Sequence, residues 1–283
     1  MKFFTTSALV ATIYSLTALA KSGPTTIAYV EVNNYNVSNV GSYSLQDGSN
    51  IFDIAIIFAA NINYNGQKAV PFNNPQVQAT LNNAATQIRP LQAKGIKVLL
   101  SYLGNHQGVG ISNFQSLAAA QDFANQVAGV VNQYGLDGVD LDDEYADYGT
   151  NGQPNANAQS ISWVIQALRQ ALPNKLVTFY YYGTASNYLA HASPSVGSML
   201  SYSWNGVYSQ YIVPNVPGLG KSQLSPAAVD FGSTSSATAA SLATKTKNNG
   251  YGVFMTYNLA STDESAYISS FTKVLYGQTA HHN

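Results

Sequence analysis

Residues 137–144, which read Asp-Gly-Val-Asp-Leu-Asp-Asp-Glu, contain five carboxylic acids. Apolar side chains between these acids favour a buried strand, and side chains along a strand point alternately to its two faces. Asp140, Asp142 and Glu144 therefore share one face of the predicted strand, with Glu144 at its carboxyl end. Acids arranged in such a row are suited to proton transfer to and from a bound substrate.

Crowded carboxyl groups raise one another's pKa, because like charges a few ångströms apart repel. One member of the row then stays protonated near neutral pH, as a general acid requires. Asp137 falls off the alternating face and is predicted to be structural, and Asp143 is predicted to face away. A solvated acidic turn or a calcium loop is the alternative. A calcium loop of the EF-hand type, however, needs oxygen ligands at alternate positions, a Gly and a distant Glu.

Eight short apolar runs, rich in β-branched and aromatic residues, predict the strands that position these acids. Such near-continuous apolar runs indicate a sheet that is buried on both faces, and therefore a parallel one. The predicted strands are residues 26–32, 52–59, 97–103, 138–145, 176–182, 199–204, 227–232 and 252–259.

Amphipathic segments between the strands predict helices, and several end at Gly or just before Pro. The predicted helices are residues 75–94, 116–134, 158–172, 236–248 and 261–276. Alternating strands and helices favour a single (β/α)8 TIM barrel, with active sites at the carboxyl ends of its strands. A doubly wound open sheet is the alternative, but the Gly-rich turn usual after its first strand is missing here. The barrel is predicted over residues 21–277, with 278–283 as a disordered tail.

Residues 1–20 have the pattern of a signal peptide: Lys2, then an apolar stretch, then Ala18-Leu19-Ala20 as a cleavage site. A buried N-terminal helix is the alternative, but Gly23 and Pro24 follow at once. We therefore expect a secreted, extracellular protein. A glycosylation sequon begins at Asn36, and it is an acceptor only in a glycosylating secretory pathway.

The composition excludes several classes of function. The chain of 283 residues has no cysteine, which excludes thiol catalysis and cysteine-bound metals. Only 9% of its residues are charged, the net charge is −1, and no Lys/Arg cluster suggests a nucleic-acid partner. No run after the leader reaches the roughly 18 apolar residues of a membrane span. We expect a soluble monomer, and the 20 tyrosines offer aromatic faces for sugar rings.

The pattern Asp-x-x-Asp-x-Asp-x-Glu at the end of a fourth strand resembles the signature of glycoside hydrolase family 18. The stretches AYVEVNN, IFAANINY, GIKVLLS, LGNHQG and QLSPAAV resemble the endo-β-N-acetylglucosaminidases of that family, in order along nearly the whole mature chain. The resemblance implies cleavage of the N,N′-diacetylchitobiose core of high-mannose or hybrid N-glycans on glycoproteins. It also implies that the reaction needs no cofactor and no metal.

The resemblance also assigns roles to the acids. Glu144 matches the catalytic acid/base, Asp142 the carboxylate that orients the substrate's acetamido group, and Asp140 a deeper acid that can share a proton with Asp142. The implied mechanism is substrate-assisted: the acetamido oxygen attacks the anomeric carbon, and an oxazolinium intermediate is opened by water with net retention. No enzymic nucleophile is then needed.

Substrate-binding candidates lie at the ends of other predicted strands. Relatives hold the acetamido group with polar side chains after the sixth strand, which here indicates Asn205 and Tyr208, with ordinary rim residues as the alternative. Tyr257 ends the eighth strand, as a platform for a sugar or as core. Asn105 and His106 follow the third strand and are candidates to contact mannose, although His106 also suits a structural hydrogen bond. Unranked residues that can reach the barrel interior are Tyr29, Glu31 and 180–182.

Two rival functions remain open. Many chitinases of the family insert an α+β domain between the seventh and eighth strands, whereas residues 232–252 hold little beyond one helix. Compact chitinases also lack this insertion, so the chitinase alternative stays. A non-catalytic chitin- or glycan-binding lectin on the same barrel would typically have lost the terminal Glu, and Glu144 is present.

Overall fold

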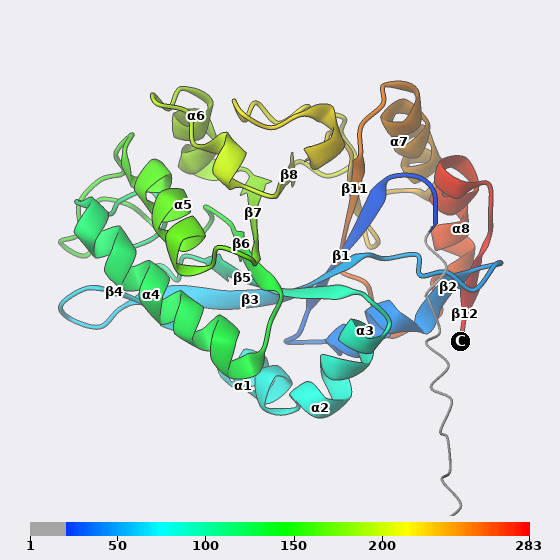
Figure 1. Ribbon diagram of the computed structural model, residues 1–283, viewed down its shortest axis with the longest axis horizontal. Coiled ribbons are helices and arrows are strands. Elements are labelled where there is room, and N and C mark those ends of the chain that lie inside the picture. Colours follow the sequence, from blue (N-terminus) through cyan, green and yellow to red (C-terminus); the bar gives the residue numbers. More distant parts are fainter. Residues whose placement is uncertain (1–20) are drawn as a thin grey trace, which may run out of the picture.

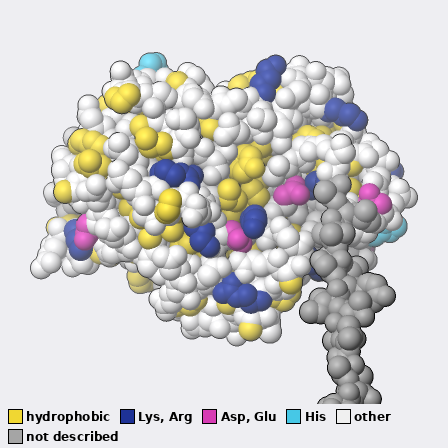
Figure 2. Space-filling view, viewed as in Figure 1, with side chains coloured by type: hydrophobic (Ala, Val, Ile, Leu, Met, Phe, Trp, Pro, Cys, Tyr) yellow, Lys and Arg dark blue, Asp and Glu magenta, His cyan; other side chains and the backbone are white. Residues whose placement is uncertain are grey.

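The computed structural model describes residues 21–283, which form a nearly closed barrel of parallel strands with helices packed around it (Figure 1). The predicted signal peptide, residues 1–20, lies outside the described residues. Charged side chains are scattered over a mostly neutral face (Figure 2). No helix in residues 21–283 combines the length and apolar character that a membrane crossing needs.

The barrel wall confirms the predicted fold class. Its strands, in spatial order, are β10 Ala228–Asp230, β11 Val253–Tyr257, β1 Thr25–Glu31, β3 Ile54–Tyr64, β5 Lys97–Leu103, β6 Gly138–Leu141, β7 Leu176–Tyr181, β8 Tyr202–Asn205 and β9 Leu224–Ser225. The two end strands, β9 and β10, are consecutive in the sequence and separated by Pro226 and Ala227. β9 pairs with β8 and β10 with β11, so together they fill the seventh position of an eightfold barrel.

The helices follow the strands with two departures from the prediction: the helix predicted over 75–94 is broken, and a helix over 183–190 was not predicted. The helices are α1 Pro75–Asn82, α2 Ala84–Gln87, α3 Arg89–Ala93, α4 Leu117–Tyr134, α5 Ser160–Ala171, α6 Gly183–Ala190, α7 Ser236–Asn248 and α8 Ser265–Tyr276. The predicted helix 75–94 is broken into α1, α2 and α3, because Asn83 ends the first and Pro90 fits only the first turn of a new helix. The connections after β1 and β8 carry 3-10 turns in the described chain, η1 Val37–Ser42 and η3 Lys221–Gln223, while η2 Gly197–Met199 precedes β8.

Alternation along β1 separates two apolar layers. Ile27 and Tyr29 point into the barrel and pack with Trp204 and other interior residues. Ala28 and Val30 point outward into the larger core beneath the helices. Because the strands are buried on both faces, their sequences are apolar almost throughout, which is why they were predictable.

Among residues 21–283, three strands lie outside the barrel wall. β4 Ala69–Phe72 folds back on β3 as an antiparallel partner, and β2 Tyr43–Leu45 pairs with β12 Ala280–His282. The prediction of a disordered tail over 278–283 is therefore wrong. The tail is ordered by backbone pairing, which its polar sequence does not report, and Asn283 N donates to Ser42 O at 2.8 Å. Between β10 and β11 only α7 intervenes, so the chitinase-type insertion is missing from the described barrel.

Candidate active site

The acidic row ends the strand β6 at the carboxyl edge of the barrel. β6 itself stops at Leu141, but the chain stays extended because Asp142 N donates to Tyr102 O at 3.0 Å and Gly104 N donates to Glu144 O at 2.9 Å. Asp140 and Asp142 are buried, whereas Glu144 is half-buried. Asp142 and Glu144 line one cavity of about 350 Å³, so the predicted shared face is confirmed.

Aromatic side chains from other strands form the rest of this catalytic cavity. Its polar groups are the two carboxyls and a set of tyrosine hydroxyls, an environment suited to a neutral, polyhydroxylated ligand. The remaining lining residues are Tyr29, Phe58, Tyr145, Tyr180, Tyr182, Gly206, Val207, Tyr208 and Tyr257.

Asp140 lies at the bottom of the row, where three hydroxyls donate to its carboxylate. Tyr29 OH and Ser101 Oγ reach Oδ2 at 2.7 and 2.8 Å, and Thr178 Oγ1 reaches Oδ1 at 2.7 Å. The indole N–H of Trp204 can only donate, and it donates to Tyr29 OH at 2.6 Å. Tyr29 must therefore direct its own proton to Asp140, which is held as an acceptor.

The titration of Asp140 leads to a prediction about stability. Burial raises the pKa of Asp140 from an ordinary 3.8 to about 6, although the hydroxyl donors oppose the rise. Between these values the folded state keeps a proton that the unfolded state has released, so the stabilisation from Asp140 is complete below pH 3.8 and is lost as the pH rises through about 6.

We expect the unfolding free energy of the wild type, relative to that of Asp140→Asn, to fall by on the order of 3 kcal/mol between about pH 4 and pH 8. The asparagine variant cannot ionise, so any constant cost of the altered hydrogen bonds cancels in the comparison. Urea denaturation of both proteins across this range measures the difference. A difference that does not change with pH would contradict the prediction.

Asp142 is only 2% exposed, and among residues 21–283 no backbone N–H or hydroxyl donates to its carboxyl, so its one neighbour for a hydrogen bond is the carboxyl of Glu144. Burial, then the charges of Glu144 and Asp140, raise the pKa of Asp142 well above its ordinary range. Burial also raises the pKa of Glu144. Asp142 and Glu144 therefore hold a proton between them near neutral pH, while the hydroxyl-bonded Asp140 below them is the ionised member.

The other two acids have structural surroundings, as predicted. Asp143 faces away from the cavity and accepts from Ser112 Oγ at 2.9 Å, Ala185 N at 2.6 Å and Tyr148 OH. It thereby ties the acidic segment to the start of α6. Asp137 accepts from Val98 N at 3.0 Å and from Gln92 Nε2 at 2.8 Å, at the other end of β6.

The backbone after Glu144 turns sharply against the end of β5. A Cβ on Gly104 would lie 2.4 Å from Ala146 Cα, so only glycine allows this approach. Tyr145 has φ of 56°, in the left-handed region that costs a non-glycine residue roughly 1 kcal/mol. Its carbonyl accepts from His106 N at 2.7 Å, which holds the turn and presents the Tyr145 ring at the cavity mouth.

Two predicted substrate-binding residues lie in the cavity. Tyr208 and Tyr257 stack with ring centroids 5.3 Å apart and planes at 28°. Burial raises the pKa of both hydroxyls, so each remains a protonated donor at neutral pH. Tyr180, on β7, lies beside Tyr208 and donates to Gly206 O at 2.9 Å. A Cβ on Gly206 would lie 2.9 Å from the Tyr180 ring, so the glycine makes room for this wall.

The structure contradicts the predicted substrate-binding role of Asn205. Its side chain is buried, and its amide donates to the carbonyls of Val207, Gln210 and Pro226 at 3.0–3.1 Å, while Oδ1 accepts from Val207 N at 2.9 Å. Every polar atom of this side chain is thus used to shape the loop that carries Tyr208.

Asn105 and His106 lie outside the lining of the catalytic cavity. Asn105 Nδ2 donates to Asn63 Oδ1 at 2.9 Å, and exposed His106 pairs with Asp147 at 2.9 Å. A contact between these residues and outer sugars stays a prediction. Sequence reasoning missed Phe58, Tyr145, Gly206 and Val207 as lining residues, and it left Tyr182 unranked. Position directly after a strand or an acid was the available signal for Tyr145 and Gly206.

The acid row, the barrel and the cavity together define a glycosidase. Residues 25–216 match the model of glycosyl hydrolases family 18, so the chain belongs to that family. Within the family it is close to the endo-β-N-acetylglucosaminidases, as the resemblance of its motifs had indicated.

Three relatives support this assignment to the endo-β-N-acetylglucosaminidases. An endo-β-N-acetylglucosaminidase of Flavobacterium sp. (strain SK1022) is 65% identical over 92% of this chain and 83% of its own length. Endo-β-N-acetylglucosaminidase F1 of Elizabethkingia meningoseptica is 36% identical over 86% of this chain and 74% of its length. EndoBT-3987 of Bacteroides thetaiotamicron, solved with a Man5GlcNAc product, has a TM-score of 0.80 and 29% identity over 93% of this chain, which spans 63% of that protein.

Proposed function

We propose that this protein hydrolyses the bond between the two N-acetylglucosamines in the core of high-mannose or hybrid N-glycans on glycoproteins. EndoBT-3987 was solved with Man9GlcNAc2Asn as substrate and with Man5GlcNAc as product. The relatives most similar in sequence carry the endo-β-N-acetylglucosaminidase name. The catalytic cavity, with its neutral aromatic walls and an acid pair at one side, is compatible with such a substrate.

The observation that carries the proposal is the buried carboxyl of Asp142, to which no group other than Glu144 can bond within residues 21–283. The proton shared with Glu144 satisfies one oxygen, and a buried polar atom without a hydrogen bond costs about 1–3 kcal/mol, so the other oxygen calls for an external partner. The N–H of a 2-acetamido group is a donor of the right kind. Once this N–H binds Asp142, the ionised form of Asp142 gains a partner and the shared proton passes to Glu144, which becomes the acid.

The proposed reaction proceeds by substrate assistance with retention. The acetamido oxygen attacks the anomeric carbon, the glycosidic bond breaks, and the proton of Glu144 goes to the departing oxygen. Asp142 stabilises the positive charge that develops on the acetamido nitrogen. In the oxazolinium ion that results, water attacks the anomeric carbon, the bond from that carbon to the acetamido oxygen breaks, and Glu144 takes up a proton from the water. Asp140 takes no part in the bond changes, and its carboxylate keeps a negative charge below Asp142.

Digestion of a defined N-glycoprotein followed by mass spectrometry tests the proposal. We expect each released site to keep one N-acetylglucosamine on asparagine. Release of chitin oligomers without glycoprotein cleavage would favour the compact chitinase. Binding of glycan without any mass change would favour the lectin, which the half-buried Glu144 at the cavity argues against.

Chelators are expected to leave activity unchanged. Within residues 21–283 no three His, Asp or Glu side chains are grouped to hold a metal ion, and the proton transfers described above run through Glu144 alone. Initial rates with and without EDTA measure this. A loss that is restored by a divalent metal would contradict the proposed chemistry.

We further propose that the protein is secreted as a monomer that acts outside the cell, without membrane attachment. The leader-like residues 1–20, with their small-x-small end, support cleavage after Ala20. Sequencing the N-terminus of protein from culture medium should give Lys21 first, and light scattering should give the mass of one chain. Retention of Met1 in the cell fraction would overturn the secretion proposal.

A further inference from the structure

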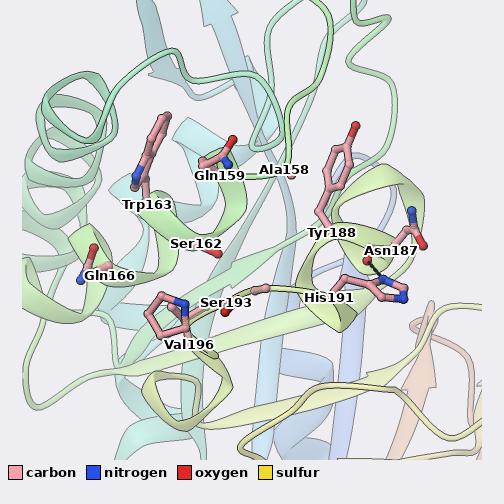
Figure 3. A pocket seen from close by; sticks show the side chains of 12 residues that line it. Ala158, Gln159, Ser162, Trp163, Gln166, Asn187, Tyr188, His191, Ser193 and Val196 are labelled. Atoms are coloured by element: carbon pink, nitrogen blue, oxygen red, sulfur yellow. Dashed lines mark hydrogen bonds between the residues drawn. The ribbon is translucent and has the colours of Figure 1, made fainter.

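A second hollow, larger than the catalytic cavity, lies between helices α5 and α6. It holds about 550 Å³, within the range of about 300–1,000 Å³ typical of small-molecule sites. Figure 3 shows that α5 supplies Trp163 and Gln166 to one wall, while α6 and the residue after it supply Tyr188 and His191 to the other. No role in the reaction described above uses these residues.

The side chains that line this hollow make few hydrogen bonds to one another. Among the side chains drawn in Figure 3, one hydrogen bond is marked, from His191 Nδ1 to the backbone oxygen of Asn187 at 2.8 Å. That bond uses Nδ1 and not Nε2 of His191, and Figure 3 marks no bond between the side chains of Gln159, Gln166 and Trp163 and the other residues drawn. The hollow therefore offers both donors and acceptors around aromatic faces.

The chemistry of these walls selects a class of ligand. None of the described residues that line the hollow is Asp, Glu, Lys or Arg, so nothing there compensates a charged ligand. Amides and hydroxyls pair well with vicinal hydroxyl groups, and the faces of Trp163 and Tyr188 can cover the apolar C–H surface of a sugar ring. A neutral hexose presents both kinds of surface.

The hollow also lies close to the catalytic cavity along the chain. Tyr182 lines the catalytic cavity and directly precedes α6, whose residue Asn187 lines the hollow. Tyr182 and Asn187 are five residues apart, which corresponds to about 8 Å along a helix axis. Asp143 fixes this helix to the acid segment through the Ala185 N–H at 2.6 Å, so the two sites keep a fixed spacing.

We propose that the α5–α6 hollow is a second carbohydrate site that binds neutral hexose residues of a mannose-rich oligosaccharide. The inference rests on the proposed function for the identity of the sugar, but not for the existence of the site. The hexoses can belong to an outer branch of the glycan that is being cleaved or to a neighbouring glycan, and the chemistry is the same in both cases.

Two variants on opposite walls test the site, with Phe72→Ala as a matched control. Trp163→Ala removes the aromatic face, and Asn187→Ala removes an exposed side chain that no fold contact needs. Phe72 is an exposed aromatic that lines neither cavity. Thermal unfolding of every variant shows that the fold is kept, and Asn187→Ala decides the test if Trp163→Ala does not fold.

The first measurement is calorimetric binding of an oligomannoside that lacks N-acetylglucosamine. We expect Trp163→Ala to weaken it about tenfold, as the loss of one aromatic anchor does in small sites, and Asn187→Ala to weaken it by a smaller factor. Equal binding by the wild type, both variants and the control overturns the proposal, as does the absence of any binding to the wild type.

Hydrolysis kinetics then distinguish the source of the hexoses. A rise in KM for Man9GlcNAc2Asn, with unchanged KM for a glycan trimmed to its core mannoses and unchanged kcat, places a branch of the substrate in the hollow. Unchanged KM for both, together with the binding loss, places a separate glycan there. If the wild type cleaves no N-glycan but the binding loss is seen, the proposed function fails and the second site stands.

Discussion

Glu144→Gln should lower kcat by about 10²–10⁴-fold or more on a natural N-glycoprotein, because the amide cannot donate the proton that the leaving oxygen needs. The substitution keeps the shape of the side chain. The carboxyl of Glu144 lies at the cavity, while its backbone oxygen accepts from Gly104 N at 2.9 Å and is unaffected by the change. We therefore expect the fold to be intact.

Binding separates this loss from a loss of structure. Calorimetry with intact glycopeptide should give an affinity for Glu144→Gln close to that estimated for the wild type from KM. Glu264→Gln is the matched control, because Glu264 lies at the start of α8, away from the catalytic cavity. Near-wild-type turnover by Glu144→Gln would remove the central assignment, and equal losses in both variants would point to a general effect of removing a glutamate.

The barrel was predictable because its strands are buried on both faces and its acids alternate with apolar residues. The periodicity placed Asp140, Asp142 and Glu144 on one face, which the hydrogen bonds and the cavity confirm. The predicted strand nevertheless extended to 145, whereas β6 ends at Leu141. Beyond that point the backbone of Asp142 and Glu144 bonds to Tyr102 in β5 and to Gly104 just after it, and a sequence pattern does not distinguish one-sided from two-sided pairing.

Elements that depend on distant backbone partners escaped the prediction. β12 forms because β2, more than 200 residues away, offers it an edge, and neither three-residue segment has a strand pattern of its own. The helix α6 has only eight residues, and its start is fixed by the distant Asp143 rather than by a side-chain cap of its own. Tertiary contacts, not local propensity, decide such elements.

The substrate-binding residues were harder to predict than the acids for a related reason. Position at the end of a strand indicated Tyr208 and Tyr257, which line the cavity, but also Asn205, whose amide donates to three backbone carbonyls. Whether a polar side chain serves a ligand or its own loop depends on the path of that loop. Tyr145 reaches the cavity mouth through a left-handed turn that the sequence does not announce.

Asp142→Asn should be a poor hydrolase that still uses a preformed oxazoline. If Asp142 holds the acetamido N–H, the asparagine loses the charge that stabilises the developing cation, and oxazoline formation slows severely. A synthetic glycan oxazoline has already completed that step. Because Asn is neutral, it also removes the like-charge repulsion with Glu144 and Asp140 that raises the pKa of Asp142, so the variant should fold at least as well as the wild type.

The decisive measurement follows donor consumption and coupled product when wild type and variant receive a glycan oxazoline and an N-acetylglucosamine acceptor. Substrate assistance predicts transfer by both proteins, with product accumulating in Asp142→Asn because the variant hydrolyses it slowly. A covalent mechanism predicts the reverse: Asp142 would be the nucleophile, the variant would lose its attacking oxygen, and oxazoline would be inert. Inert oxazoline together with a trapped glycosyl-Asp142 adduct in the wild type would therefore replace the proposed mechanism. Transfer by Asp142→Asn instead requires the oxazoline itself to lie on the reaction path, because no carboxylate then remains at that position to attack the sugar.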